Sequence, residues 1–214
     1  VITTAVGFPT TLNPILQVGA VPVFIDVTLP HMVADVTQLE AALSDRTRAV
    51  VFAHTLGYPF DLDAVTAFCK RNNLYLIEDV CDGLGSEYNG KKCGTFGDVS
   101  TFSFYPAHQV GTGEGGAAVV RSSVRSRILQ SYRDWGRDCY CLPGKDNTCG
   151  KRWARDYDHK YTYSRVGYHL QTTEFTGAIG CAQMDRLPEF VAKRRANHDM
   201  LNALAFERGL SQHF

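Results

Sequence analysis

The chain has 214 residues, of which 44% are hydrophobic and 21% are charged, and its 22 basic side chains balance its 22 acidic ones. This composition is typical of a soluble globular protein with a substantial core. A zero net charge argues against a nucleic-acid partner, and the lack of an apolar run of about 20 residues argues against a membrane span. With no signal-peptide pattern at its start, the sequence is expected to belong to a cytoplasmic protein.

Strand-like and helix-like stretches alternate through the first half of the chain. The sequence opens inside an apparent strand, Val1 to Val6, which suggests a piece of a longer polypeptide. Apolar runs then predict strands at 22–27, 49–53 and 74–78, with helices at 37–43 and 61–71. This alternation predicts an α/β fold with a mainly parallel sheet covered by helices.

The second half of the chain is less regular. Strands are predicted at 99–104 and 116–120, a helix near 124–135, and helical structure from 174 to 206 with a break at Pro188. Between these helices lies a polar loop, Arg137 to Arg152, which is much longer than the usual connection of about 4–6 residues. We expect a metal centre to hold this loop.

The chain contains seven cysteines. Two of them, Cys69 and Cys181, lie in apolar helical patterns and are expected to be buried. Four others are separated by 57, one and seven residues: Cys81, Cys139, Cys141 and Cys149. Four thiolates can bind either zinc or an iron–sulfur cluster. The one-residue gap is unlike a zinc knuckle, but the spacing alone leaves both possibilities open.

An acidic pair, Glu78 and Asp79, ends the strand predicted at 74–78. Open parallel sheets bind ligands at the carboxyl ends of their strands. A carboxylate placed there can pair with the protonated pyridine nitrogen of a cofactor and keep the ring an electron acceptor. Because carboxylates at strand ends also cap helices, the pair alone leaves this role open.

A signature follows further along the chain. The segment Ser103-Phe104-Tyr105-Pro106-Ala107-His108, followed by Gly113-Glu114-Gly115-Gly116, resembles that of the DegT-type sugar aminotransferases and dehydratases, which are fold-type I pyridoxal-phosphate enzymes. Their signature is Ser-Phe-x-x-x-Lys followed by Gly-Glu-Gly-Gly, and His108 stands here at the lysine position. An imidazole cannot link covalently to pyridoxal phosphate (PLP), so we expect pyridoxamine 5′-phosphate (PMP) to be held non-covalently. A histidine suits proton transfer near neutral pH, and His108 is the expected catalytic residue.

Within this group the chain is similar to the NDP-4-keto-6-deoxyhexose 3-dehydrases, of the type that acts on CDP-4-keto-6-deoxyglucose. The shared features are His108, the cysteine spacing and the segment 133–152. The resemblance implies a [2Fe–2S] cluster and PMP-dependent removal of the C3 hydroxyl from a nucleotide-linked sugar, in 3,6-dideoxyhexose and lipopolysaccharide O-antigen biosynthesis. It assigns the four cysteines as ligands of the cluster: Cys81, Cys139, Cys141 and Cys149. It also implies a homodimer and an NAD(P)H-dependent iron–sulfur flavin reductase as the electron donor.

The same resemblance assigns five residues to the cofactor. Asp79 would pair with the pyridine nitrogen, Phe8 would stack on the ring, and Ser103 would bind the phosphate. Asp82 would lie near the ring hydroxyl. His169 replaces an asparagine that in relatives reaches the cofactor phosphate of the other subunit, and an imidazole can still donate that hydrogen bond.

The resemblance also implies that residues 1–214 are part of a large, cofactor-binding domain. The phosphate loop that precedes this region in relatives and the small domain that follows it are absent from the sequence. We therefore expect the isolated chain to be inactive. Two alternatives remain: a cluster-free dehydratase of the same group, which leaves the cysteines unexplained, and a non-catalytic, zinc-stabilised binding module.

Overall fold

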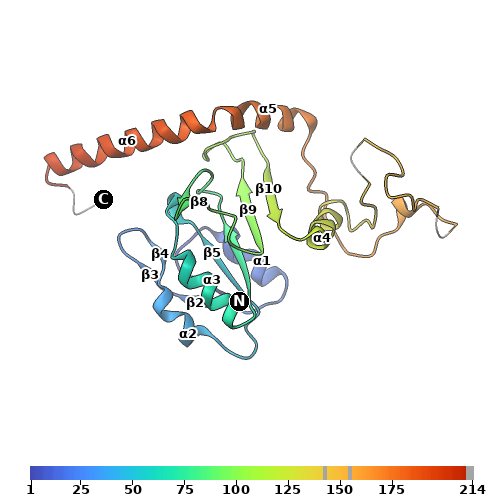
Figure 1. The fold of residues 1–214 in the computed structure, drawn as a ribbon, viewed down its shortest axis with the longest axis horizontal. Helices are drawn as coiled ribbons and strands as arrows, with labels where there is room; N and C mark the ends of the chain where they lie inside the picture. The colour runs from blue at the N-terminus through green and yellow to red at the C-terminus, as the bar shows by residue number, and fades with distance from the viewer. Residues whose placement is uncertain (142–143, 154–155, 211–214) are drawn as a thin grey trace. The chain divides into compact units, whose positions relative to one another are not determined.

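The structure is a computed structural model that describes residues 1–141, 144–153 and 156–210 (Figure 1). The chain divides into two compact units. The first, the sheet unit, comprises Val1–Ala117 and Phe175–Phe214, and the second, the loop unit, comprises Ala118–Glu174. Among the helices in the described ranges, none has the length and apolar character needed to cross a membrane.

A six-stranded sheet runs through the fold in the order β10-β9-β6-β5-β1-β2 (Figure 1). Its strands are β1 (Ile2–Thr4), β2 (Val23–Ile25), β5 (Ala49–Ala53), β6 (Tyr75–Asp79), β9 (Val99–Ser103) and β10 (Gly116–Val120). The described pairings of β1 with β2 and β5, of β5 with β6, and of β6 with β9 are all parallel. The predicted α/β class with a mainly parallel sheet is confirmed.

Two short antiparallel pairs and several helices complete the described elements. The pairs are β3 (Val27–Thr28) with β4 (Val33–Ala34) and β7 (Glu87–Tyr88) with β8 (Lys91–Lys92). The α-helices are α1 (Pro9–Gln17), α2 (Leu39–Ala42), α3 (Leu62–Arg71), α4 (Ser123–Arg133), α5 (Glu174–Asp185) and α6 (Leu187–Glu207). The 3₁₀ turns are η1 (Val36–Gln38), η2 (Thr55–Gly57) and η3 (His159–Tyr161).

Helix α3 shows how the local sequence sets these boundaries. The Asp61 carboxylate accepts a hydrogen bond of 2.9 Å from the backbone N–H of Ala64, so Asp61 caps the helix. Leu62, Val65 and Phe68 recur at helical spacing and are buried in the main hydrophobic cluster. The helix therefore spans the residues predicted for it.

One helix and the environment of one cysteine differ from what the sequence predicts. Helix α1 was not predicted, although Pro9 fits the first helical turn, where its missing N–H has no intrahelical partner to lose. Cys181 lies exposed on α5, whereas Cys69 is buried as expected. The expectation for Cys181 was wrong because the apolar residues of α5 do not gather on one buried face: none of them is buried. The break near Pro188 is confirmed, because α5 ends at Asp185 and α6 begins at Leu187.

A buried carboxylate fixes the end of β6. Glu78 has no exposed surface, and its oxygens accept hydrogen bonds from the backbone N–H groups of Gly94 (2.7 Å) and Phe96 (2.9 Å) and lie 3.1 Å from Nε2 of His54. Burial alone would raise the pKa of Glu78, but the bonds from His54 and the loop N–H groups outweigh it and lower that pKa. Glu78 thus anchors the loop beside β6, next to the residue that carries the site.

Candidate functional site

Asp79 lies at the carboxyl end of β6, where parallel sheets bind ligands. The Thr11 hydroxyl, from α1, donates a hydrogen bond of 2.7 Å to its Oδ2 atom. The backbone N–H of Cys81 donates a bond of 3.1 Å to its Oδ1 atom. Each carboxylate oxygen retains a free lone pair after these bonds. Asp79 is therefore held in place as an acceptor that can still take one more N–H.

His108 is oriented by a second carboxylate. Its Nδ1 atom lies 3.2 Å from Oδ1 of Asp82, and the imidazole is mostly buried, with 19% of the side chain exposed. The Gln109 side chain donates to the backbone carbonyl of Asp82, which ties the two segments together a second time. A carboxylate at Nδ1 places the proton on that nitrogen and leaves Nε2 as the proton acceptor. Asp82 was predicted to lie near the cofactor hydroxyl, and the contact that the structure gives it is with His108.

Two further predicted residues lie on the sheet unit. Phe8 immediately precedes α1, and 72% of it is exposed, so its ring is not part of the core. Ser103 ends β9, the strand next to β6, and its Oγ accepts a bond of 3.2 Å from the Tyr105 N–H. The ring of Phe8 is free to stack on a planar ligand, and Ser103 lies on the same edge of the sheet as Asp79.

A hollow of about 490 Å³ adjoins His108. Lys193 and Arg194 of α6 line it together with His108 and Gln109. The guanidinium of Arg194 donates a bond of 3.2 Å to the backbone carbonyl of His108, which connects α6 to the signature segment. The two cations give this hollow a positive character suited to an anionic ligand.

The loop unit brings its own set of residues together by antiparallel pairing. Asp134 bridges His169, and Arg137 bridges Tyr163. The pairing requires a glycine at position 136: its φ is +84°, and a Cβ there would collide with the carbonyl of Arg165. The backbone after α4 therefore lies directly against the extended segment that follows η3.

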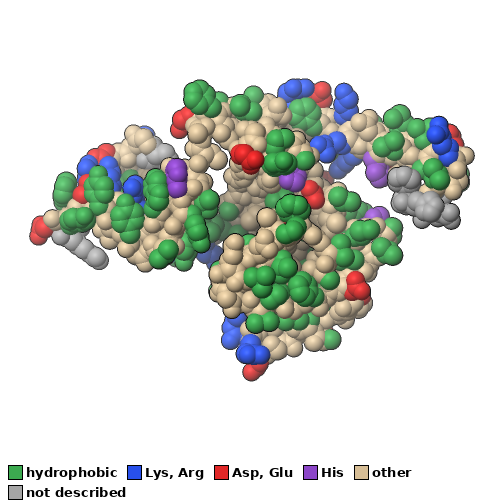
Figure 2. Space-filling model, turned by 180° about the vertical axis from the view of Figure 1, so that it is seen from behind, with side chains coloured by type: hydrophobic (Ala, Val, Ile, Leu, Met, Phe, Trp, Pro, Cys, Tyr) green, Lys and Arg blue, Asp and Glu red, His purple; other side chains and the backbone are tan. Residues whose placement is uncertain are grey.

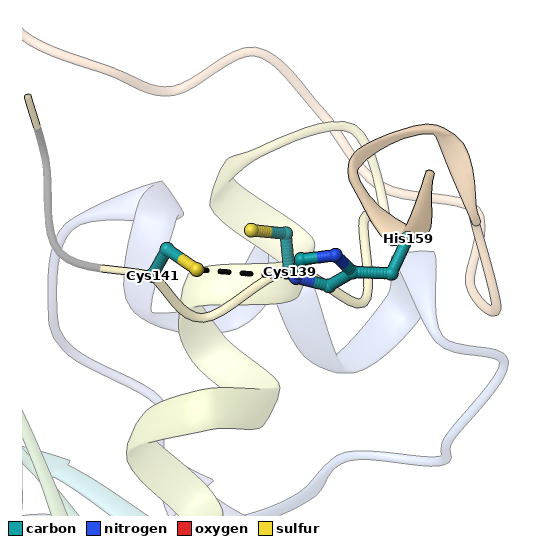
Figure 3. Close-up of side chains that lie close together, drawn as sticks. All are labelled: Cys139, Cys141 and His159. Atoms are coloured by element: carbon teal, nitrogen blue, oxygen red, sulfur yellow. Dashed lines mark hydrogen bonds between the residues drawn. The ribbon is translucent and has the colours of Figure 1, made fainter. Parts of the chain in front are cut away.

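Three thiols and an imidazole meet beyond that pairing. The sulfur of Cys141 lies 3.5 Å from that of Cys149, and Nε2 of His159 lies 3.2 Å from Cys149 Sγ and 3.9 Å from Cys141 Sγ. The ligand atoms of Cys139, Cys141 and His159 lie within 4.8 Å of one another. Figure 3 shows the Cys139 and Cys141 sulfurs beside the ring, with the Cys141–His159 contact dashed. Three of the four predicted cysteine ligands are thus gathered, together with a histidine that was not predicted.

The electrostatics of these thiols differ. The backbone N–H of Cys149 donates to the Cys141 sulfur and is the main reason that its pKa falls to about 6, while burial raises the pKa of Cys139. Cys81 belongs to the sheet unit, where burial, followed by the neighbouring Asp79, raises its pKa to about 12. Cys141 therefore carries thiolate character at neutral pH, which favours metal binding.

His169 lies in the loop unit and stacks on Trp135, with ring centroids 4.6 Å apart. Its backbone is held by the bridge to Asp134. The stacking fixes the plane of the imidazole, so the ring is preorganised as a hydrogen-bond donor or acceptor. The proposed contact of this residue with a cofactor phosphate stays a prediction.

The parallel sheet, with the acidic end of β6 and the signature after β9, has the fold of the fold-type I PLP enzymes. The chain belongs to the DegT/DnrJ/EryC1/StrS aminotransferase family, whose model matches residues 1–210. The solved GDP-4-keto-6-deoxy-D-mannose 3-dehydratase of E. coli, with bound hydrated PLP, superimposes with a TM-score of 0.83 at 28% identity, over 95% of this chain and 52% of that one.

Two curated relatives are more similar in sequence. The lipopolysaccharide biosynthesis protein RfbH of Salmonella typhimurium is 51% identical over an alignment of 208 residues, and the match covers 94% of this chain and 48% of that protein. The dTDP-4-dehydro-2,6-dideoxy-D-glucose 3-dehydratase of Saccharopolyspora spinosa is 50% identical over an alignment of 204 residues, and the match covers 92% of this chain and 44% of that protein. The chain thus spans about half the length of these relatives.

The residues present fit the cofactor of this family. Asp79 offers an acceptor for a pyridinium N–H, Phe8 offers an exposed ring, and Ser103 offers a hydroxyl at the same sheet edge. His108 stands where a covalent anchor would be, and its imidazole is held by Asp82 instead. The site therefore fits a non-covalently held PLP or PMP.

Proposed function

We propose that this chain is the cofactor-binding part of a PMP-dependent enzyme that removes the C3 hydroxyl of a nucleotide-linked 4-keto-6-deoxyhexose. The observation that carries this proposal is His108 at the lysine position of the signature, with Nδ1 held 3.2 Å from Asp82. An oriented imidazole can move a proton but cannot anchor the cofactor, so dehydration is favoured over amino transfer. A relative at 50% identity named as a 3-dehydratase supports the same choice.

When bound, pyridoxamine phosphate would supply an amine for the C4 ketone of the sugar and a ring that accepts the electron pair left behind when a C–H proton is removed. Asp79 holds the pyridine nitrogen in its protonated form, and its own position is fixed by Thr11 and the Cys81 N–H. His108 removes the proton from the cofactor's C4′ carbon through Nε2. The resulting imidazolium is stabilised by Asp82 and returns a proton to the C3 oxygen, which leaves as water.

The substrate proposed for this site is anionic. Lys193 and Arg194 line the hollow beside His108 and provide cations for the diphosphate of a nucleotide sugar. The names of the relatives support this substrate class, because two of them are dehydratases of a dTDP-linked and a GDP-linked sugar. Biosynthesis of lipopolysaccharide O-antigen is the proposed setting, supported by the similarity to RfbH.

Loss of the C3 oxygen with retention of the C4 ketone is a two-electron, two-proton reduction of the sugar, so the reaction requires an electron donor. A [2Fe–2S] cluster would supply these electrons one at a time, with an NAD(P)H-dependent iron–sulfur flavin reductase as the proposed source. Its proposed ligands are Cys81, Cys139, Cys141 and Cys149. The gathered sulfurs of the loop unit support this assignment, as does the hydrogen bond from the Cys81 N–H to Asp79.

A homodimer is the proposed assembly, with His169 of one copy reaching the cofactor phosphate of the other. Exposed large apolar side chains are consistent with a covered surface in the assembled enzyme, and Figure 2 shows hydrophobic side chains gathered in patches on one face. The exposed large apolar side chains include those of Val18, Val21, Phe24 and Phe206.

The test uses a chimera, because this chain spans less than half of the S. spinosa dehydratase. Residues of this chain replace the matching segment of that protein, and the chimera is supplied with its named sugar nucleotide, PMP, NADPH and a flavin reductase. The proposal expects a product that lacks the C3 oxygen, identified by mass spectrometry. A C4-amino sugar as the product would overturn it.

Iron and sulfide reconstitution tests the cluster separately. The 214-residue chain, treated anaerobically with ferrous iron and sulfide, is expected to bind two irons and two sulfides and to lose them when Cys141 is replaced by serine. The cluster-free alternative predicts a dehydrating chimera whose activity is unchanged by Cys141→Ser. The binding-module alternative predicts no dehydration in any variant.

A further inference from the structure

The loop unit carries a basic hollow beside Cys139. Its volume is about 630 Å³, and its walls come from α4, from the segment that follows α4 and from the segments around η3. One carboxylate and four cationic side chains line it: Asp138, Arg127, Arg137, Lys151 and Arg165. The carboxylate is already engaged, because Asp138 accepts a hydrogen bond from the Ser164 hydroxyl and lies 3.6 Å from the Arg165 guanidinium. Positive charge is therefore in excess around this hollow, although the net charge of the chain is zero.

Three of the four cations keep their charge available. Arg127 and Lys151 are exposed, and the Arg127 guanidinium lies over the Tyr140 ring, 4.3 Å from its centroid, which orients the charge without neutralising it. Arg137 donates to the neutral Tyr163 hydroxyl, and its buried Nε atom has no hydrogen-bond partner among the described residues. The arginine and lysine ion pairs described in the loop unit are made by other residues: Arg133, Arg152, Lys160 and Arg165.

The position of the hollow indicates what kind of partner it fits. Cys139, a proposed ligand of the cluster, is itself one of the lining residues. The proposed reaction consumes two electrons that neither the sugar nor this chain supplies, so an electron donor has to approach these sulfurs. Interfaces between redox proteins are small, and complementary charge steers their encounter. A cationic hollow at the sulfurs is therefore complementary to a donor with an acidic surface.

We propose that an acidic electron-carrying protein docks on this hollow, with its carboxylates against Arg127 and Lys151. The proposal rests on the electron supply of the proposed function. Each encounter would pass one electron, so the donor is oxidised by one electron and two encounters provide the two that C3 deoxygenation consumes. The whole surface lies within one compact unit, Ala118–Glu174.

The test measures the rate at which the 214-residue chain, after iron and sulfide treatment, associates with the iron–sulfur flavin reductase used with the chimera. At low ionic strength Arg127→Gln and Lys151→Gln should each slow association about threefold, and the double variant about tenfold, with a smaller change in dissociation. These differences should shrink at about 0.15 M salt, where the Debye length is about 8 Å. Matched controls are Arg121→Gln and Lys145→Gln, which each remove an exposed cation of the same unit that does not line the hollow.

Carbodiimide cross-linking of the unmodified chain to the reductase avoids any folding defect of the variants. This reagent joins an amine directly to a carboxylate, so peptide mass spectrometry should find Lys151 linked to an acidic residue of the reductase. Equal association rates for the double variant and the double control, or cross-links that leave out Lys151, would overturn the proposal. Charge-dependent association without a deoxygenated sugar from the chimera would defeat the proposed reaction and leave the docking surface standing. Deoxygenation with association rates that do not depend on Arg127 and Lys151 would do the reverse.

Discussion

The Oδ1 atom of Asp82 lies 3.2 Å from Nδ1 of His108, and this contact decides which nitrogen of the ring is free to accept a proton. Asp82 lies three residues beyond the end of β6, and His108 lies five residues beyond the end of β9, the neighbouring strand. The pairing of these parallel strands therefore brings a carboxylate and an imidazole together across 26 residues of sequence.

Replacing Asp82 by asparagine should slow dehydration by the chimera without preventing cofactor binding. An amide can still contact the ring but no longer stabilises the imidazolium, so kcat is expected to fall about tenfold or more, with a smaller change in KM. The pH dependence of kcat should also shift, which a merely structural role would not cause. Asp199→Asn on α6, an exposed site, is the control. Equal pH profiles for Asp82→Asn and the unmodified chimera would remove Asp82 from this role.

Replacing His108 by lysine should create a covalent attachment to PLP. The unmodified site holds the cofactor without an amine, so borohydride treatment of the PLP-incubated chain should leave the peptide around residue 108 unlabelled. In His108→Lys the new amine is expected to be reduced onto the cofactor, which peptide mass spectrometry locates at that position. His198→Lys controls for labelling of exposed amines. If position 108 stays unlabelled while cofactor fluorescence shows binding, the site does not lie where Asp79 and His108 place it.

The stability of the chain should depend on Glu78 in acid. Its pKa is lowered in the folded state, so its contribution is present above its unfolded value of 4.5 and is lost as the pH falls through the folded pKa. As the pH falls from about 7 to about 3.5, thermal unfolding of the unmodified chain should show a steep loss of stability. Glu78→Gln is expected to cost about 2–4 kcal/mol at neutral pH and to flatten that slope. An equally steep acid loss in Glu78→Gln would show that another group is responsible.

Gly136→Ala should disable the metal site from a distance. The new Cβ would collide with the Arg165 carbonyl and force apart the pairing that brings Cys139 beside η3. We expect a loss of at least about 2 kcal/mol in stability together with less iron bound after iron and sulfide reconstitution. Gly177→Ala in α5, where a Cβ meets nothing within 4 Å, should be neutral or slightly stabilising. Iron content after reconstitution and thermal unfolding, measured on both variants, separate the two outcomes.

The sequence predicted the elements whose signals are local. The apolar run at 49–53 is strand β5, and the capping aspartate Asp61 precedes helix α3. Helix α1 was not predicted because proline usually breaks a helix, and this segment contains both Pro9 and Pro14. In the structure Pro9 occupies the first turn, where it is tolerated, and Pro14 removes only one backbone hydrogen bond from the nine-residue helix. Local sequence signals therefore predict a helix where its capping residue and its apolar periodicity agree. They fail where the effect of a proline depends on its exact position in the helix.

The sequence predicted which residues belong to the candidate site but not the contacts between them. Asp79 and His108 were identified from a strand end and a signature, but the contact between His108 and Asp82 follows from the order of the strands. His159 was missed because its closeness to the cysteines depends on the antiparallel pairing of two irregular segments. The neighbouring Asp158, a carboxylate next to a histidine near the cysteine-rich loop, was the one signal in the sequence that could have indicated it.

The most direct measurement of the proposed reaction is product analysis for the chimera and its His108→Asn variant under identical reducing conditions. An oriented imidazole as the proton carrier predicts a sugar without its C3 oxygen from the chimera, and a rate at least about 100-fold lower for His108→Asn with the cofactor still bound. Equal rates of C3 deoxygenation in the two proteins would contradict it.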